Sequence, residues 1–203
     1  MKDQNINNIN IKENYIRFII IGVLPEPLRW EITEISEEFF NMSGSQTALT
    51  YPPHVTLRTG AIVPVSEIEN YIEGFRKTVE IFRNKNLEKS LINISTPDWV
   101  DYRENEINKH LILYFIEKSK WLMELNKTLL EYKKYIKSNK TDFQPHISLV
   151  YDDLDDENFE KLKMYIIQNK MKYEKKSSFY LTEASLYYQD NDGYWKEYFS
   201  VQV

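Results

Sequence analysis

Apolar and polar positions along the chain predict strands and helices in turn. Residues 15–24 are mostly apolar and β-branched, and Pro25-Glu26-Pro27 follows directly, which favours a strand that ends near residue 24. Apolar side chains then recur at helical spacing from Leu28 to Phe39. The first half is therefore expected to contain, in order, a strand at 15–24, a helix at 28–39, a strand at 54–60, a helix at 68–82 and a strand at 90–96.

The second half of the chain repeats this order and adds a hairpin. Asp155, Asp156 and Glu157 suit the positive N-terminal end of a helix whose apolar positions follow at helical spacing. Further on, Asp190-Asn191-Asp192-Gly193 is typical of a hairpin turn. The expected segments are a strand at 110–116, a helix at 121–136, a strand at 146–151, a helix at 155–166, and strands near 173–180, at 183–189 and at 194–203.

The two halves share one further feature, because the second strand of each opens with Pro-His. These histidines, His54 and His146, are about as far apart in the chain as the two opening strands, which indicates an internal duplication. We therefore predict an α+β fold with two pseudo-symmetric lobes of antiparallel or mixed sheet and flanking helices. Residues 1–13 are expected to form a flexible polar tail, and residues 14–203 a single bilobal domain. In sequence, the lobes are expected at about 14–98 and 108–203.

The pattern Pro-His-apolar-Ser/Thr-Leu occurs once in each half and supplies the candidate catalytic side chains. Successive side chains of a strand project from opposite faces, so the histidine and the hydroxyl residue share one surface while the apolar residues face the core. This places His54 with Thr56, and His146 with Ser148. Two such strands, related by the duplication, would gather two imidazoles and two hydroxyls around one cleft.

Two histidines at one phosphorus atom suit general acid–base cleavage of a phosphoester. One imidazole takes a proton from the attacking water or hydroxyl, and the other gives a proton to the leaving oxygen. The ordinary histidine pKa of about 6.5 makes both forms available near neutral pH. The hydroxyls of Thr56 and Ser148 would bind the non-bridging oxygens. This chemistry requires no metal and no cofactor.

Three other residues are candidates for substrate binding. Arg58 lies two residues after Thr56, on the same strand face if alternation continues, and could neutralise a phosphate. Tyr151 should lie on the face opposite Ser148 unless a bulge intervenes. Tyr51, just before the proline pair, could stack on a base. His110 has no hydroxyl residue two positions on, so we interpret it as structural.

Composition and charge limit the kinds of molecule that the protein is expected to bind. The chain has 203 residues, 42% of them hydrophobic, with 26 basic and 31 acidic residues and a net charge of −5. Because proteins that hold long nucleic acid are usually basic, we expect a small nucleotide or an RNA end and no long duplex. The apolar stretch at 15–24 is too short to cross a membrane, and cysteine is absent, so the expected location is the cytoplasm. We assign no oligomeric state.

The two motifs resemble those of the 2H phosphoesterase superfamily, which includes RNA 2′,5′-ligase-like proteins and 2′,3′-cyclic nucleotide phosphodiesterases. Their spacing extends the resemblance over nearly the whole chain from about residue 14. The resemblance implies two pseudo-symmetric lobes with both motifs in a central groove, catalysis by His54 and His146, and phosphate binding by Thr56 and Ser148. By similarity to the cyclic phosphodiesterases, His146 is favoured as the base for water and His54 as the acid.

Other functions compete with cleavage of a 2′,3′-cyclic phosphate. The same chemistry could degrade a cyclic dinucleotide or oligonucleotide signal, as some viral members of that superfamily do. A non-catalytic nucleotide- or RNA-binding module is disfavoured because both histidines and both hydroxyls are retained. A metallohydrolase with His54, His146 and Asp142 as ligands would need more carboxylates than the motifs supply.

Overall fold

The computed structural model describes residues 15–85, 87–104, 107–132, 143–174, 177–190 and 192–203. The predicted tail at 1–13 and the end of the helix predicted at 121–136 lie outside these ranges. No helix in the described ranges is both long and apolar enough to span a membrane.

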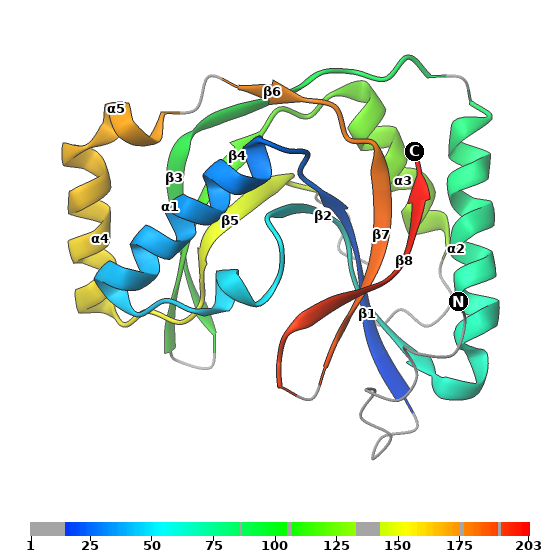
Figure 1. Cartoon of the computed structure of the whole chain (residues 1–203), viewed down its shortest axis with the longest axis horizontal. Helices are drawn as coiled ribbons and strands as arrows, with labels where there is room; N and C mark the ends of the chain where they lie inside the picture. Colours follow the sequence, from blue (N-terminus) through cyan, green and yellow to red (C-terminus); the bar gives the residue numbers. More distant parts are fainter. Residues whose placement is uncertain (1–14, 86, 105–106, 133–142, 175–176, 191) are drawn as a thin grey trace.

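The first of two four-stranded sheets combines strands from the two ends of the chain (Figure 1). Its order is β2-β1-β7-β8, and all neighbouring strands are antiparallel. The strands are β1 (Tyr15–Val23), β2 (His54–Pro64), β7 (Glu183–Gln189) and β8 (Trp195–Gln202).

The second sheet takes its strands from the middle of the chain. Its order is β5-β4-β3-β6, again antiparallel throughout. The strands are β3 (Ile92–Glu104), β4 (Ile107–Ile116), β5 (His146–Tyr151) and β6 (Ser178–Phe179). The predicted α+β class with two lobes is confirmed, and both sheets are antiparallel.

The predicted lobe boundaries are wrong, because the halves of the chain exchange strands. β3 follows β1 and β2 in sequence but pairs with β4 of the other sheet. In the corresponding place of the second half, β7 follows β5 and pairs with β1. Strands β2 and β5 occupy matching edges of the two sheets, as the duplication requires.

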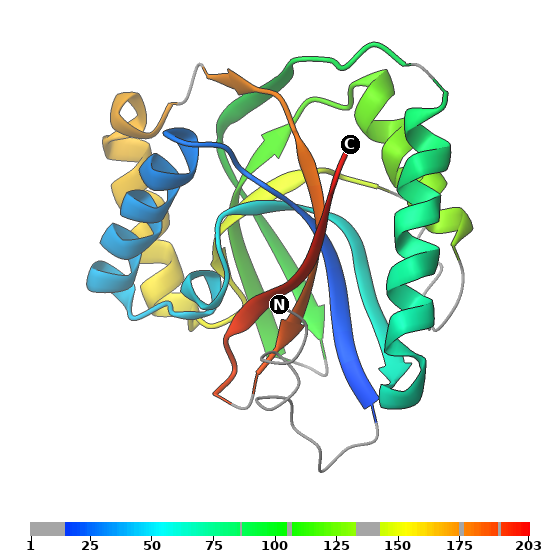
Figure 2. The ribbon, with the colours of Figure 1, turned by 45° about the vertical axis from the view of Figure 1, so that its right-hand side comes forward.

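The helices are exchanged in the same way (Figure 2). Helix α1 connects β1 to β2 yet contacts β5 and α4, on the side of the second sheet. Helix α3 connects β4 to β5 yet contacts α2 and β2, on the side of the first sheet. The helices are α1 (Leu28–Ser43), α2 (Ile68–Arg83), α3 (Lys120–Glu131), α4 (Asp156–Gln168) and α5 (Lys170–Tyr173), with short 3-10 turns η2 (Thr47–Thr50) and η3 (Val65–Glu67).

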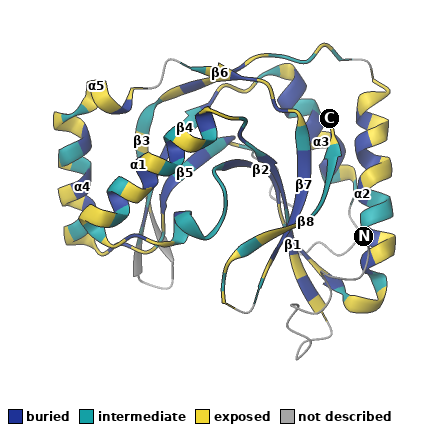
Figure 3. Cartoon of the chain, in the orientation of Figure 1, coloured by how far each residue is buried: buried dark blue, intermediate teal, exposed yellow. Residues whose placement is uncertain are grey.

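Burial follows the predicted periodicities (Figure 3). Along α1 the apolar positions at helical spacing are buried, and along β2 Val55 and Leu57 are fully buried. Ser119 caps α3 by accepting a hydrogen bond from the Leu122 N–H, and Asp155 caps α4 through the Asn158 N–H. The edge strands β2 and β5 contact each other, so the two His motifs come together where the sheets meet.

Candidate active site

The two motif histidines lie on the adjoining edge strands β2 and β5. His54 opens β2 and is 8% exposed, and His146 opens β5 and is half-buried. They are close enough for a positive charge on His146 to oppose a positive charge on His54. The structure therefore brings together the two imidazoles that sequence spacing predicted as one site.

Both imidazoles are held by the same backbone contact. Nδ1 of His54 lies 2.9 Å from the carbonyl oxygen of Pro52, and Nδ1 of His146 lies 2.8 Å from that of Gln144. A carbonyl oxygen only accepts, so each Nδ1 carries the proton. In the neutral ring, Nε2 then keeps its lone pair, which is the arrangement that a proton acceptor needs.

Burial sets the protonation state of His54. Removal from water is the largest effect and lowers the pKa of His54 to about 4. The nearby His146 also lowers this pKa, whereas the hydrogen bond to the Pro52 carbonyl raises it. The hydroxyl oxygen of Thr56 lies 3.1 Å from Nε2, and the hydroxyl donates because this nitrogen is unprotonated. In the ligand-free protein, His54 is thus a neutral imidazole at neutral pH.

The hydroxyl residues of the two motifs have corresponding positions. Thr56 and Ser148 are both half-buried, two residues after their histidines. The Thr56 hydroxyl contacts His54, whereas the Ser148 hydroxyl makes no side-chain hydrogen bond within the described residues.

A bulge follows the hydroxyl residue in both strands. The pairing shifts between Thr56 and Arg58 on β2, and between Ser148 and Val150 on β5. Each bulge inserts one residue and reverses the alternation beyond it. Tyr151 is consequently exposed on the side of His146 and Ser148, which is the exception that the sequence prediction had allowed for.

The prediction that Arg58 shares the face of Thr56 is wrong for the same reason. Arg58 is buried and turned toward α3, where its guanidinium donates to the carbonyl of Tyr132 at 2.5 Å and to that of Leu130 at 3.5 Å. Burial lowers its pKa, although Tyr71 and Tyr132 oppose this effect. Arg58 therefore ties β2 to the end of α3.

Tyr51 lies directly against the site. Its ring meets the His54 ring edge-on, with centroids 4.6 Å apart and an interplanar angle of 82°. Burial raises its pKa, and the nearby Tyr151, Asp153 and Asp152 raise it further. Tyr51 thus lies beside His54, and Tyr151 from the other half lies within electrostatic reach of Tyr51.

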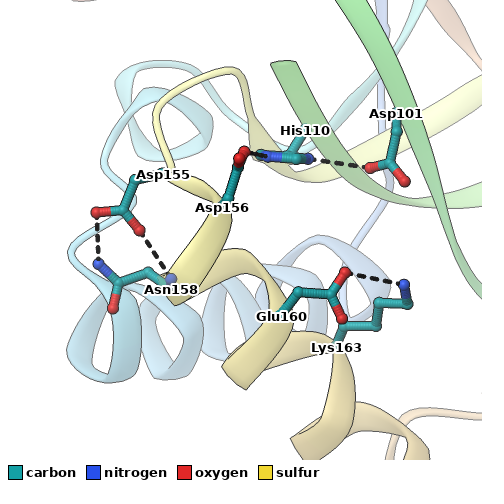
Figure 4. Close-up of polar contacts among 7 residues, drawn as sticks. All are labelled: Asp101, His110, Asp155, Asp156, Asn158, Glu160 and Lys163. Atoms are coloured by element: carbon teal, nitrogen blue, oxygen red, sulfur yellow. Dashed lines mark hydrogen bonds and ion pairs between the residues drawn. The ribbon is translucent and has the colours of Figure 1, made fainter. Parts of the chain in front are cut away.

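His110 is structural, as predicted (Figure 4). Its Nδ1 lies 3.0 Å from a carboxylate oxygen of Asp101, and its Nε2 lies 2.8 Å from one of Asp156. The ring also stacks on Phe159, with centroids 4.0 Å apart. Both nitrogens are therefore occupied at a place outside the two motifs.

A metal centre would need several ligands gathered in one place. Among the described residues, no group of three or more His, Cys, Asp or Glu side chains could hold a metal ion. Asp142, the carboxylate considered as a third ligand, lies outside the described ranges.

Sequence reasoning missed Asp153. This carboxylate, just beyond β5, binds the segment that leads to Tyr51 and His54. The acidic run at 152–157 was visible in the sequence, but only the fold brings it beside residues 45–47. The carbonyls of Pro52 and Gln144 were also missed. Each belongs to the residue that precedes the proline of a Pro-His pair, so the repeated Pro-His pair was the sequence signal that could have indicated them.

Comparison with known proteins rests on structure alone. No family model matches the sequence, and no curated protein does either. The fold resembles E. coli LigT complexed with 3′-AMP, with a TM-score of 0.54 and 14% identity over 93% of this chain and 98% of that one. It also resembles TT0787 of Thermus thermophilus, with a TM-score of 0.56 and 13% identity over 92% and 97% of the two chains.

A third structure, described as a phosphoesterase, gives a TM-score of 0.51 and 15% identity over 93% of this chain and 98% of that one. These matches span nearly the whole of each chain, so the likeness in fold includes both sheets. The chain therefore shares the fold of E. coli LigT and of the structure described as a phosphoesterase, an α+β fold with two antiparallel sheets, as its two motifs predicted.

Proposed function

We propose that this protein is a metal-independent phosphodiesterase that cleaves a small nucleotide or RNA-end phosphodiester, typically a 2′,3′-cyclic phosphate. The observation that carries the proposal is the matched pair of imidazoles on β2 and β5. Each has its Nδ1 committed to a backbone carbonyl, which leaves Nε2 for proton transfer. The similarity of the fold to that of E. coli LigT, a 2H phosphoesterase, also supports phosphodiesterase activity.

His54 acts as the base in this mechanism. Burial keeps it neutral, with a pKa of about 4, so its Nε2 can take a proton from water at neutral pH. The water oxygen then bonds to phosphorus, and the bond from phosphorus to the ribose oxygen breaks. His146 donates a proton to that leaving oxygen. This assignment is the reverse of the one favoured by similarity to the cyclic phosphodiesterases.

Thr56 and Ser148 bind the non-bridging phosphate oxygens in the proposed complex. The Thr56 hydroxyl, which donates to His54 in the ligand-free protein, would turn to the phosphate and release the Nε2 lone pair. Ser148 offers the equivalent hydroxyl from the other half. Donors placed where charge develops typically contribute about 10²- to 10³-fold to kcat each.

The aromatic pair beside the site favours a substrate with a base. Tyr51 lies against His54, and Tyr151, exposed at the end of β5, comes from the opposite half and lies within electrostatic reach of Tyr51. Base–aromatic stacking contributes about 1–3 kcal/mol per base and tolerates different sequences. E. coli LigT has been crystallised with 3′-AMP, a mononucleotide, which is the size of ligand proposed here.

A substrate panel tests this proposal. We expect hydrolysis within a panel of 2′,3′-cyclic mononucleotides, 2′,5′-linked dinucleotides and cyclic dinucleotides, with products identified by mass spectrometry. His54→Ala and His146→Ala should each lower kcat by at least about 10²-fold, because each removes one proton-transfer group. Chelator should leave the rate unchanged.

Controls separate this mechanism from its competitors. His110→Gln should retain kcat in the fraction that remains folded. Both ring nitrogens of His110 are bonded to Asp101 and Asp156, outside the two motifs. Turnover confined to cyclic dinucleotides would indicate degradation of a nucleotide signal instead. Binding without turnover across the panel would indicate a non-catalytic module. Strict dependence on added divalent metal would contradict the acid–base mechanism.

A further inference from the structure

A carboxylate from the other half of the chain binds the segment between α1 and β2. Asp153 accepts a hydrogen bond from the Ser45 hydroxyl at 2.6 Å through one oxygen. Its second oxygen accepts from the backbone N–H groups of Gln46 and Thr47, at 2.5 and 2.7 Å. Three donors that begin the 3-10 turn η2 thus converge on one side chain.

Asp153 is placed by the strand that carries the second motif. It follows Tyr151, the last residue of β5, by two positions. Between them, Asp152 adopts a left-handed backbone with φ of +59°, and its N–H donates to the carbonyl of His110 at 3.0 Å. This turn directs Asp153 toward the first half of the chain.

The other end of the held segment is the first motif. Turn η2 ends at Tyr51, whose backbone is extended and whose ring lies edge-on against His54. The N–H of Leu24, at the end of β1, also bonds to the Pro53 carbonyl at 3.2 Å. Asp153 thus connects the end of β5, the strand that carries Ser148, to the segment that leads into the Tyr51–His54 contact.

We propose that Asp153 is a positioning residue of the active site: by clamping residues 45–47 it holds Tyr51 against His54 and fixes the two motif strands relative to each other. The inference rests on the proposed function for its kinetic consequence. Its structural consequence, the cover that Tyr51 gives to His54, is independent of turnover.

Loss of the clamp should change two quantities. Displacement of a reacting group by about 1 Å can cost about 10²-fold in rate, so kcat should fall by about tenfold to a hundredfold while KM changes much less. Displacement of Tyr51 from the His54 ring should also let water reach that ring. Because the titratable groups near that ring are His146 on β5 and Tyr51 itself, hydration should raise the pKa of His54 from about 4 toward its ordinary value.

The test uses graded variants of the full chain. Asp153→Ala removes all three hydrogen bonds, Asp153→Asn keeps one acceptor oxygen, and Ser45→Ala removes one donor only. Asp155→Asn is the matched control: it removes the same charge two residues away and keeps the cap of α4, since asparagine caps as well as aspartate. We would measure kcat and KM on the best substrate of the panel, and titrate the His54 ring nitrogens by NMR.

The expected order of effects is Asp153→Ala, then Asp153→Asn, then Ser45→Ala, with Asp155→Asn like the wild type. An Asp153→Ala variant with the wild-type kcat and the wild-type His54 titration would overturn the inference, as would an equal effect of Asp155→Asn. If Asp153→Ala does not fold, the milder two variants decide by the same criteria. If the wild type hydrolyses nothing in the panel, the proposed function fails, and the NMR titration alone still decides whether the clamp holds.

Discussion

At the scale of single residues, the proline before each motif histidine explains the orientation of the imidazole. Proline fixes its own φ near −65° and restricts the preceding residue to extended conformations. The carbonyl of that preceding residue, Pro52 or Gln144, then lies within hydrogen-bond distance of the histidine Nδ1. The Pro-His pair therefore contributes to the chemistry, because it selects the tautomer in which Nε2 carries no proton.

The buried position of His54 predicts the pH dependence of catalysis. With a pKa of about 4 in the ligand-free protein, His54 is the neutral base above that pH and loses this role as the pH falls through it. The acidic limb of kcat/KM, which reports ionisations of the free enzyme, should therefore lie near pH 4. Rates measured from pH 3.5 to 9 check this. An acidic limb that disappears in His146→Ala and persists in His54→Ala would instead make His146 the base.

At the scale of elements, His110 connects helix α4 to the paired strands β3 and β4. It lies on β4 and bonds to Asp101 on β3 and to Asp156 in the first turn of α4. Carboxylates only accept, so both ring nitrogens donate and the imidazole is positively charged. Burial alone would lower the pKa of His110, but the hydrogen bonds to Asp101 and Asp156 outweigh it and raise the pKa above its ordinary value.

This contact predicts a pH-dependent contribution to stability. A raised folded-state pKa means that the contribution is complete below the unfolded pKa of about 6.5 and is lost as the pH rises through the folded pKa. The carboxylates of Asp101 and Asp156 are 55% and 67% exposed, so solvent screening limits the expected effect to about 1 kcal/mol. Urea unfolding of the wild type and His110→Gln checks this: the difference in unfolding free energy should be larger at pH 6 than at pH 9. An equal difference at both values would contradict it.

Periodicity predicted where most elements lie, and it failed where a strand departs from regular alternation. The apolar spacing located β1, α1 and α4 within a few residues. The bulges after Thr56 and Ser148 leave no mark in the sequence that separates them from regular strand. As a result the motif residues were placed correctly, while Arg58, one residue past a bulge, was assigned to the wrong face. Side chains before a bulge can be predicted from alternation, and those after it cannot.

At the scale of the whole molecule, the duplication could be predicted from the sequence, but the exchange of strands between the two halves could not. The repeated order of strands and helices follows from local patterns along the chain. Which sheet the later strands of each half join depends on contacts across the fold, and β3, like β7 after the short strand β6, joins the other sheet. Sequential lobes were therefore the wrong division, although the single bilobal domain and the meeting of β2 with β5 follow from the duplication.

The exchange predicts that the two lobes unfold together. Each sheet depends on strands and helices that belong in sequence to the other half, so neither half can keep its sheet when the other unfolds. Leu125 on α3 is fully buried on the side of the first sheet, and Leu125→Ala should cost about 2–5 kcal/mol. Hydrogen exchange detected by mass spectrometry should show β2 and β5 losing protection at the same, lowered urea concentration.

Calorimetry provides the second measurement of this cooperativity. One transition with equal calorimetric and van't Hoff enthalpies is expected for the wild type and for Leu125→Ala, at a lower temperature in the variant. Met171→Ala, at a side chain that is 91% exposed, should leave the transition within about 0.5 kcal/mol of the wild type. A variant in which β2 loses protection while β5 keeps it would show that the lobes fold separately, and the coupling of the two motifs through shared strands would have to be abandoned.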